Sequence, residues 1–277
     1  MMDDQARSVA IETLLVSRNP RHMQTAREAL EPGYYLRAAQ TLKALTGHII
    51  IGTGFPVTGT FETDGPVGAI ALYQSLEKLG AKPVIACGPL LGKALAEDYR
   101  ILELRAEGLA GAREEAAAQI KQLKPQAIVA IERPGLAADG RYYNMRGVDI
   151  SDRCFFFDAF IELAKCPTIG IGDGGNEIGM GNIIEALAPL EITPSVTRCD
   201  ELLVADVSNW AAYGIIAFLS RWAQRDLLEE IAPVAILNYL SGLGSVDGVT
   251  GANTLTEDGL DVTEGMQVIK ALQALTG

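Results

Sequence analysis

The chain has 277 residues, and 48% of them are hydrophobic, so it can bury a sizeable core in one large domain. Its net charge of −12 argues against a nucleic-acid partner, because no run of Lys and Arg is available to neutralise phosphates. No uncharged apolar stretch is long enough to span a membrane, and the acidic N-terminus lacks the pattern of a secretory signal. We therefore expect a soluble, cytoplasmic protein with no membrane association.

Residues 1–45 carry apolar residues at helical spacing, with interruptions at Pro20 and at the Pro32-Gly33 pair. We expect a helical N-terminal segment that packs on the core, followed by an α/β catalytic domain over residues 46–277. Short apolar runs, which predict strands, stand at 48–52, 83–88, 127–132, 168–172, 202–207 and 234–240. Stretches with helical spacing lie between most of them, at 67–79, 114–123, 153–165, 183–187 and 210–228.

This alternation predicts an α/β fold, with a mostly parallel sheet covered by helices on both faces. The uniformly apolar strands suit a sheet that is buried on both sides. Polar clusters follow the expected strands, beginning at Gly52, Glu132, Gly172, Asp206 and Ser241. Because ligands bind outside the carboxyl ends of parallel strands, we expect the functional site at this rim of the sheet.

The most informative segment is the glycine-rich stretch 168–182, which lies between an expected strand and an expected helix. It combines six glycines with the carboxylates of Asp173 and Glu177 and the amides of Asn176 and Asn182. Such a turn lets the backbone approach a ligand and directs N–H groups at an anion. The alternative is a loop that merely needs positive φ angles.

Glu62 and Asp64 stand two apart, a spacing that suits two carboxylates converging on Mg²⁺ or Mn²⁺. Alternatively, or in addition, Asp64 caps the helix that begins near Pro66. Glu132 ends an apolar strand, where burial would raise the pKa of its carboxyl, so we interpret it as a metal ligand or general base. The alternative is a structural ion pair with Arg133.

Arg146 lies between glycine-flanked turns and is suited to bidentate capture of a carboxylate or phosphate, although exposed arginines are also common. Asp173, Asn176 and Glu177 form a plausible partial shell for a hard divalent ion. No nucleotide cofactor is expected, because the first expected strand is followed by neither a P-loop nor a complete dinucleotide fingerprint. The widely spaced cysteines and the two histidines predict free thiols and no zinc site.

Five motifs together resemble the D-glutamate cyclase family, over a range from about residue 45 to the C-terminus. They are Gly52-Thr-Gly-Phe, Glu62-Thr-Asp-Gly-Pro-Val-Gly-Ala, Ile131-Glu-Arg-Pro-Gly, Tyr143-Asn-Met-Arg-Gly and Gly170-Ile-Gly-Asp-Gly-Gly-Asn-Glu-Ile-Gly-Met-Gly. The resemblance implies an α/β domain that converts D-glutamate to 5-oxo-D-proline with loss of water. Some members of the family are also associated with a divalent metal.

In this cyclisation the α-amine attacks the γ-carboxylate, so a base, a proton donor and neutralisation of the developing charge are needed. We expect Glu132 to act as the base, Arg146 to anchor the α-carboxylate and Asp173 to take part in catalysis. The expected metal ligands, for Mn²⁺ or Mg²⁺, are Glu62, Asp64, Asp173 and Glu177. The expected substrate-binding residues are Gly174, Gly175, Asn176, Asn144 and Thr53.

Two further hypotheses stay open. The Gly172-Asp-Gly-Gly-Asn-Glu segment resembles the metal-binding motif of haloacid-dehalogenase-like phosphatases, which favours a metal-dependent phosphatase acting on a small phosphomonoester. However, the Asp-x-Asp nucleophile pair of that family is missing after the first expected strand. The other hypothesis is a non-catalytic module that binds an acidic ligand or a metal. In every case we expect a small acidic partner, and a homo-oligomer is compatible with the sequence.

Overall fold

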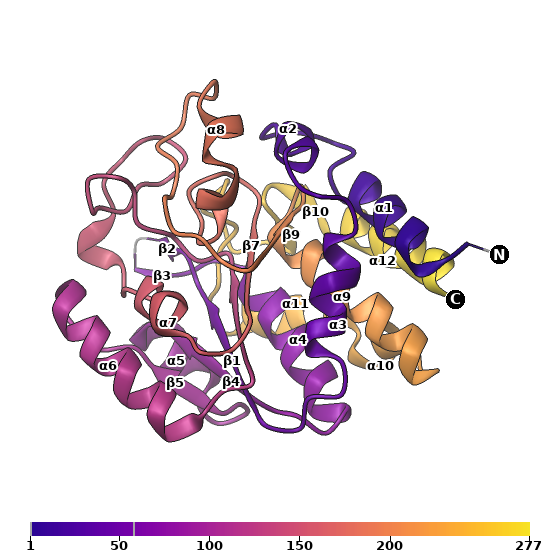
Figure 1. Ribbon diagram of the computed structural model, residues 1–277, viewed down its shortest axis with the longest axis horizontal. Coiled ribbons are helices and arrows are strands. Elements are labelled where there is room, and N and C mark those ends of the chain that lie inside the picture. Colours follow the sequence, from indigo (N-terminus) through magenta and orange to yellow (C-terminus); the bar gives the residue numbers. More distant parts are fainter. Residues whose placement is uncertain (1, 58) are drawn as a thin grey trace.

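Six parallel strands form the central sheet in the computed structural model, which describes residues 2–57 and 59–277 (Figure 1). In spatial order they are β5 (Ile101–Glu103), β4 (Lys82–Cys87), β1 (His48–Thr53), β6 (Ala127–Ile131), β7 (Thr168–Gly172) and β8 (Glu201–Val204). In β1, Ile50 pairs with Val84 of β4 on one side and with Ile128 of β6 on the other. The predicted α/β fold with a parallel sheet is confirmed.

Both faces of the sheet are buried, which explains the uniformly apolar strands. Along β1, Ile49 and Ile51 belong to the core on one face, and Ile50 belongs to the core on the other face. The first face is covered by α3 (Tyr34–Leu42), α4 (Pro66–Lys78) and α9 (Ser208–Ala223). The second face is covered by α6 (Gly108–Leu123) and α7 (Asp158–Leu163).

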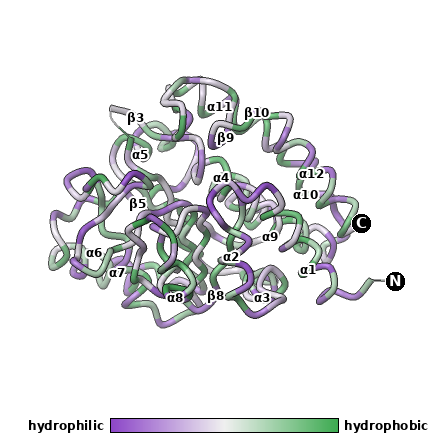
Figure 2. Tube along the Cα trace, turned by 90° about the horizontal axis from the view of Figure 1, so that it is seen from above, coloured by the Kyte–Doolittle hydropathy of each residue, from purple (hydrophilic) through white to green (hydrophobic). Residues whose placement is uncertain are grey.

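The helical N-terminal segment is also confirmed. It contains α1 (Asp4–Leu15) and α2 (Met23–Glu28) ahead of α3. Buried residues of these helices share the core of the first sheet face. The helix α1 packs against α12 (Val262–Thr276), so both ends of the chain lie on one side of the molecule, opposite α6 and α7 (Figures 1 and 2).

The remaining elements are short and surround the sheet. They are β2 (Pro56–Val57), β3 (Thr60–Phe61), α5 (Pro89–Leu95), η1 (Ser151–Arg153), η2 (Met180–Ile183), α8 (Ile184–Leu187), α10 (Leu227–Ile231), α11 (Pro233–Gly242), β9 (Thr256–Glu257) and β10 (Leu260–Asp261). The pairs β2–β3 and β9–β10 are antiparallel hairpins. Within the described residues, no helix combines the length and apolarity that crossing a bilayer requires.

One predicted strand is wrong. Residues 234–240 form most of α11, which packs against α4 outside the sheet. Pro233 occupies the first turn of the helix, where a missing N–H costs nothing. A short apolar run does not distinguish a buried strand from a buried helix. The sixth strand of the sheet is instead β5, a three-residue edge strand that the sequence analysis missed.

The strand order creates a crevice beside β1. The next two strands of this sheet along the chain, β4 and β5, lie on one side of β1, and the later strands β6, β7 and β8 lie on the other. The connections from neighbouring strands therefore diverge at the carboxyl ends of β1 and β6. Parallel sheets of this type bind their ligands at such a point.

Candidate active site

Six acidic side chains gather at the carboxyl ends of β1, β6 and β7. They are Glu62, Asp64, Glu132, Asp173, Glu177 and Asp258, and together they are called the acid cluster below. Glu132 directly follows β6 and Asp173 directly follows β7, whereas Asp64 precedes α4. One carboxylate oxygen from each of Asp64, Glu132 and Asp173 lies within 4.8 Å of the other two. The structure thus brings together acids from three separate segments.

The N-terminus of α9 holds three of these carboxylates. The Ser208 N–H donates to Asp64 Oδ2 at 3.2 Å and to Asp173 Oδ2 at 3.0 Å. The Asn209 N–H donates to Asp64 Oδ1 at 2.9 Å, and the Ser208 hydroxyl donates to Glu132 Oε2 at 2.6 Å. The first N–H groups of a helix lack intrahelical partners and carry partial positive charge, so they stabilise carboxylates.

The helix α9 caps α4 in return. Asn209 Oδ1 accepts hydrogen bonds from the N–H groups of Gly65, at 2.9 Å, and Gly68, at 2.7 Å, at the start of α4. Asn209 Nδ2 donates to Glu257 Oε1 in the β9–β10 hairpin at 2.8 Å. Asp64 Oδ1 also accepts the N–H group of Gly65 at 2.9 Å, directly ahead of Pro66, so the expected role of Asp64 at the start of α4 holds in part, whereas Asn209 is the side chain that accepts the Gly68 N–H inside that helix.

Glu132 has an unusual backbone conformation. Its φ of 45° lies in the left-handed region, which costs a residue with a Cβ atom about 1–2 kcal/mol. The strain turns the chain directly after β6, and the side chain is 7% exposed. Strained residues of this kind concentrate at functional sites, where the surrounding structure enforces them.

A single arginine from the N-terminal segment enters the acid cluster. Arg21, in the connection between α1 and α2, forms ion pairs with Asp173 and with Asp258, the latter at 2.6 Å. Burial alone would lower the pKa of Arg21, but the two carboxylates raise it above its usual value. Asp258 lies in the turn of the β9–β10 hairpin with φ of 53°.

Burial raises the pKa of every carboxyl in the acid cluster. The pKa values of Glu62, Glu132 and Asp173 lie well above their usual range, because burial disfavours the charged form and neighbouring carboxylates repel it. The same causes raise the pKa of Asp64 to about 7 and the pKa of Asp258 to about 8. The cluster therefore favours bound protons or an added cation.

A cavity of about 380 Å³ opens onto the acid cluster. Four members of the acid cluster line it, namely Glu62, Glu132, Asp173 and Asp258. The other residues that line the cavity include Arg21, Asn144, Arg146, Arg153, Asn176, Phe55 and Ile150. The volume is sufficient for a small ligand, and the lining combines acids, arginines and apolar groups.

The predicted binding residues of this cavity have different surroundings. Arg146 is exposed, and Asn144 uses its Oδ1 to accept the Arg146 N–H at 2.9 Å, which shapes the turn. Asn176 donates to the Tyr143 carbonyl at 2.8 Å, while its buried Oδ1 has no hydrogen-bond donor among the described residues. A buried acceptor without a donor is costly, and a ligand N–H would satisfy it.

The glycine-rich loop folds around Glu177. The Glu177 carboxylate accepts the N–H groups of Gly174 and Gly175, each at 2.8 Å. A Cβ atom on Gly172 would lie 2.7 Å from Glu177 Oε2, and Gly175 has φ of 106°. The glycines thus make room for this carboxylate. Binding of substrate by these N–H groups, or of metal by Glu177, stays a prediction that requires Glu177 to move.

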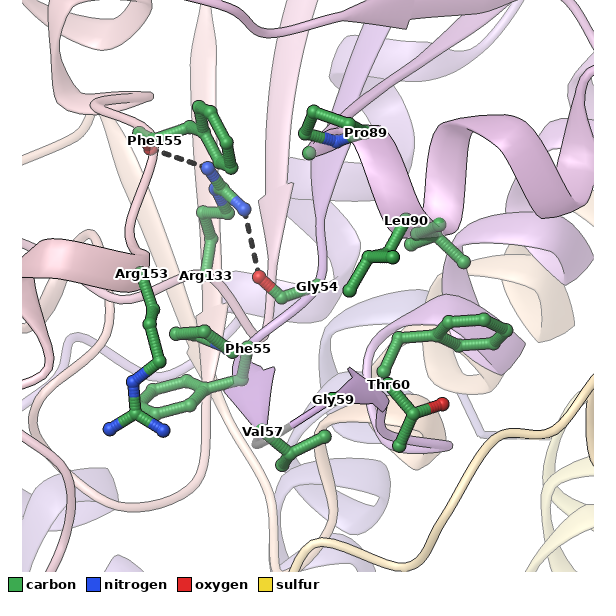
Figure 3. Close-up of a pocket in the computed structure, with 14 residues that line it drawn as sticks. Gly54, Phe55, Val57, Gly59, Thr60, Pro89, Leu90, Arg133, Arg153 and Phe155 are labelled. Atoms are coloured by element: carbon green, nitrogen blue, oxygen red, sulfur yellow. Dashed lines mark hydrogen bonds between the residues drawn. The ribbon is translucent and has the colours of Figure 1, made fainter. Parts of the chain in front are cut away.

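Thr53 and Arg133 lie beneath the site. Thr53 is fully buried and is absent from the lining of the 380 Å³ cavity, so its predicted contact with substrate remains untested. Arg133 donates to the carbonyls of Gly54, at 2.8 Å, and Phe155, rather than pairing with Glu132 (Figure 3). Arg133, Gly54 and Phe155 line a second, largely apolar cavity of about 300 Å³, which Thr53 does not line. Arg133 therefore ties the end of β1 to the segment before α7.

The donor set of the acid cluster fits a hard divalent cation. Asp64, Glu132 and Asp173 each offer an oxygen ligand, as Mg²⁺ and Mn²⁺ prefer. Within residues 2–57 and 59–277, Arg21 is the basic side chain that forms ion pairs with the cluster, so its negative charge is only partly balanced. An added cation would favour the ionised carboxylates.

Three contributors were missed in the sequence analysis. Arg21 lies in a segment that was interpreted only as a helical annex, and nothing in its local sequence indicates its contact. Asp258 precedes Gly259, which is an ordinary turn pair. Ser208 follows an expected strand, and its place after Asp206 in a polar cluster was the available signal.

Comparisons with known proteins agree with these motifs. A family model described as "D-glutamate cyclase-like, C-terminal" matches residues 11–273. The human protein "D-glutamate cyclase, mitochondrial" is 38% identical over 200 residues, which are 62% of this chain and 32% of that protein. The chain thus spans about a third of the length of this relative.

A solved structure of an exopolyphosphatase-related protein from Bacteroides fragilis aligns at a TM-score of 0.42 and 11% sequence identity. The alignment covers 88% of this chain and 57% of the chain in that structure. This likeness is too weak to support an argument about fold or function. The family model, in contrast, covers nearly the whole sequence, including the acids after β1, β6 and β7. The chain belongs to the D-glutamate cyclase-like family.

Proposed function

We propose that this protein converts D-glutamate to 5-oxo-D-proline with loss of water. The observation that carries the proposal is the convergence of Asp64, Glu132 and Asp173 at the crevice beside β1, next to a cavity that also contains arginines. Membership of the family and the name of the human relative support the choice of substrate. A small acidic molecule also matches the mixture of charges in the cavity.

The reaction makes specific demands on the site. The α-amine nitrogen forms a bond with the γ-carboxyl carbon, and one carbon–oxygen bond of that carboxyl breaks. Two protons leave the ammonium nitrogen, and two protons reach the departing oxygen, which becomes water. The net charge of substrate and product is the same, so the protein mainly has to move protons and stabilise the intermediate.

Glu132 is the proposed proton carrier. It lines the cavity, and its pKa is raised by burial and by the neighbouring Asp173, so it accepts an ammonium proton more readily than an exposed glutamate. The same carboxyl then donates this proton to the departing oxygen, and the second proton follows the same route once Glu132 is ionised again. The hydrogen bond from the Ser208 hydroxyl, at 2.6 Å, and the constrained backbone hold the side chain in place.

Arg146 is the proposed anchor of the α-carboxylate, because its exposed guanidinium borders the cavity and can bind a carboxylate through two N–H groups. Asn176 offers its unsatisfied Oδ1 to the substrate amine. Asp64 and Asp173, with Glu132 or Glu62 beside them, would hold a Mn²⁺ or Mg²⁺ ion, which supplies electrostatic stabilisation when bound.

Incubation of the purified protein with D-glutamate, L-glutamate and a panel of phosphomonoesters tests the proposal. Each substrate is tested with Mn²⁺, with Mg²⁺ and with a chelator, and 5-oxoproline and phosphate are measured by chiral chromatography and colorimetry. We expect 5-oxo-D-proline from D-glutamate. Release of phosphate instead would favour the phosphatase, and binding of D-glutamate without product would favour the non-catalytic module.

Glu132→Gln provides the matching site variant. It keeps the size of the side chain but removes the proton carrier, so turnover should fall by about 100-fold or more. Glu114→Gln, on the exposed surface of α6, is the matched control and should retain full activity. Full activity of Glu132→Gln would reject the assigned role of Glu132.

A further inference from the structure

The side chain of Arg21 has an unused edge. Its Nη1 nitrogen forms the ion pairs with both Asp173 and Asp258. Its Nε and Nη2 groups make no hydrogen bond with any residue in the described part of the chain. The side chain is 20% exposed and lines the 380 Å³ cavity. A guanidinium edge of this kind binds a carboxylate through two parallel hydrogen bonds.

The backbone around Arg21 is fixed by a separate carboxylate. Asp206, two residues beyond the end of β8, is 1% exposed and accepts the N–H groups of Arg18, at 2.7 Å, and Asn19, at 2.9 Å. The Asp206 N–H in turn donates to the Leu15 carbonyl at 2.7 Å. Asp206, through its carboxylate and its N–H group, therefore binds the connection after α1 to the edge of the sheet, just ahead of Arg21.

We propose that Arg21 is a further catalytic residue, which binds the γ-carboxylate of the substrate through Nε and Nη2, and that Asp206 is its positioning residue. This inference rests on the proposed cyclisation of D-glutamate. The reacting carboxylate must lie among groups that carry protons, and Arg21 is the cation that contacts the acid cluster. The α-carboxylate, which does not react, is left to Arg146.

The electrostatic reason is direct. A γ-carboxylate that enters the cavity meets Glu62, Glu132, Asp173 and Asp258, and the ionised members of this set repel it unless a cation receives it. Arg21 also faces the negative charge that develops on the carboxyl oxygen when the amine attacks, so its contribution grows along the reaction. The N-terminal segment therefore completes the site instead of only covering the sheet.

The test compares Arg21→Gln with Arg113→Gln, which removes an exposed guanidinium that pairs with Glu162 outside the cavity. Steady-state kinetics with D-glutamate should show kcat/KM lower by about 10- to 100-fold for Arg21→Gln, with part of the loss in KM. Arg21→Lys should recover part of this loss, because it restores the charge without the bidentate edge. Arg113→Gln should retain the wild-type constants.

D-Glutamine, used as a competitive inhibitor, distinguishes recognition of the γ-carboxylate from a general loss of structure. Its γ-carboxamide lacks the charge, so its inhibition constant should change little in Arg21→Gln while KM for D-glutamate rises. Asp206→Asn should lower kcat/KM for D-glutamate as well, but should add little to Arg21→Gln in the double variant. Circular dichroism and thermal melting establish that each variant is folded.

Each outcome decides one question. Wild-type protein that does not cyclise D-glutamate overturns the proposed function, and this inference with it. Active wild type combined with unchanged kinetics of Arg21→Gln overturns only the role of Arg21. Equal losses for D-glutamate and D-glutamine overturn recognition of the γ-carboxylate, and additive losses in the double variant overturn the positioning role of Asp206.

Discussion

At the scale of single residues, Glu132 combines two costs that a structural role would not require. Its backbone is left-handed, and its carboxyl is buried among other acids with a pKa far above the usual range. Either feature alone lowers the stability of the folded chain. Together they indicate a position where function opposes stability.

Replacement of Glu132 by glycine should therefore remove activity without lowering stability. Glycine adopts this φ freely and carries no carboxyl, so the melting temperature should stay constant or rise by about 2–4 °C, for a gain near 1 kcal/mol. Thermal melting and the 5-oxoproline assay measure the two effects. Gln224→Gly, at the exposed end of α9 with φ of 53°, is the control that should gain stability and keep activity. A strongly destabilised Glu132→Gly would contradict this view of the residue.

Much of the acid cluster was accessible from the sequence, because Glu132 and Asp173 directly follow recognisable apolar strands of a parallel sheet. The geometry of such a sheet places those positions side by side. Arg21 and Asp258 were not accessible, because they reach the cluster from an N-terminal connection and a C-terminal hairpin. No local pattern encodes where these segments fold back, since long-range packing decides it.

At the scale of elements, α4 and α9 cap each other. Asp64, ahead of α4, accepts the first N–H groups of α9, and Asn209, in the first turn of α9, accepts N–H groups at the start of α4. Sequence patterns describe capping within one helix, so this exchange between helices was missed. It fixes the position of Asp64 in the acid cluster through the packing of two long buried helices.

Asn209→Ala should therefore weaken both the fold and the site. It leaves the Gly68 N–H group without its acceptor and the Gly65 N–H group with Asp64 Oδ1 alone, which should cost about 2 kcal/mol in the free energy of unfolding. Urea denaturation measures this loss, and turnover should fall because the start of α4, which directly follows Asp64, is no longer held against α9 by the Asn209 side chain. The control is Asn238→Ala on the exposed face of α11, where a change within about 0.5 kcal/mol is expected. Equal effects of the two substitutions would contradict a capping role for Asn209.

Periodicity predicted the long elements well and the short ones poorly. The helices α4 and α9 and the strands β1, β4, β6 and β7 lie close to their predicted ranges. The strand β5 has three residues, too few to show a period, and α11 has apolar residues on most sides because it is packed against α4. Length and environment, rather than composition, explain both differences.

At the scale of the whole molecule, the acid cluster concentrates part of a net charge of −12 in one buried place. Asp258 has a pKa of about 8, against 3.8 for an ordinary aspartate. A folded-state pKa above the unfolded value means that the folded state holds the proton more tightly. The resulting stability is complete below about pH 4 and is lost as the pH rises to about 8.

Asp258→Asn should consequently gain stability relative to wild type as the pH rises from about 5 to about 9 in the presence of a chelator. Melting temperatures across this range measure the difference between the two proteins. Addition of Mn²⁺ should stabilise wild type more at the alkaline end, because ionised carboxylates bind the ion. Asp149→Asn, which removes an exposed acid, is the control, and a difference that is independent of pH would contradict the assignment.

The loop around Glu177 shows how misleading a glycine count can be. Glycine usually indicates a flexible backbone. Here the absence of side chains lets the Glu177 carboxylate accept hydrogen bonds from the consecutive N–H groups of Gly174 and Gly175. A turn that the glycines make flexible in the unfolded chain is thus held in one conformation by Glu177 in the folded protein. These hydrogen bonds therefore fix the backbone next to Asp173, the acid that follows β7.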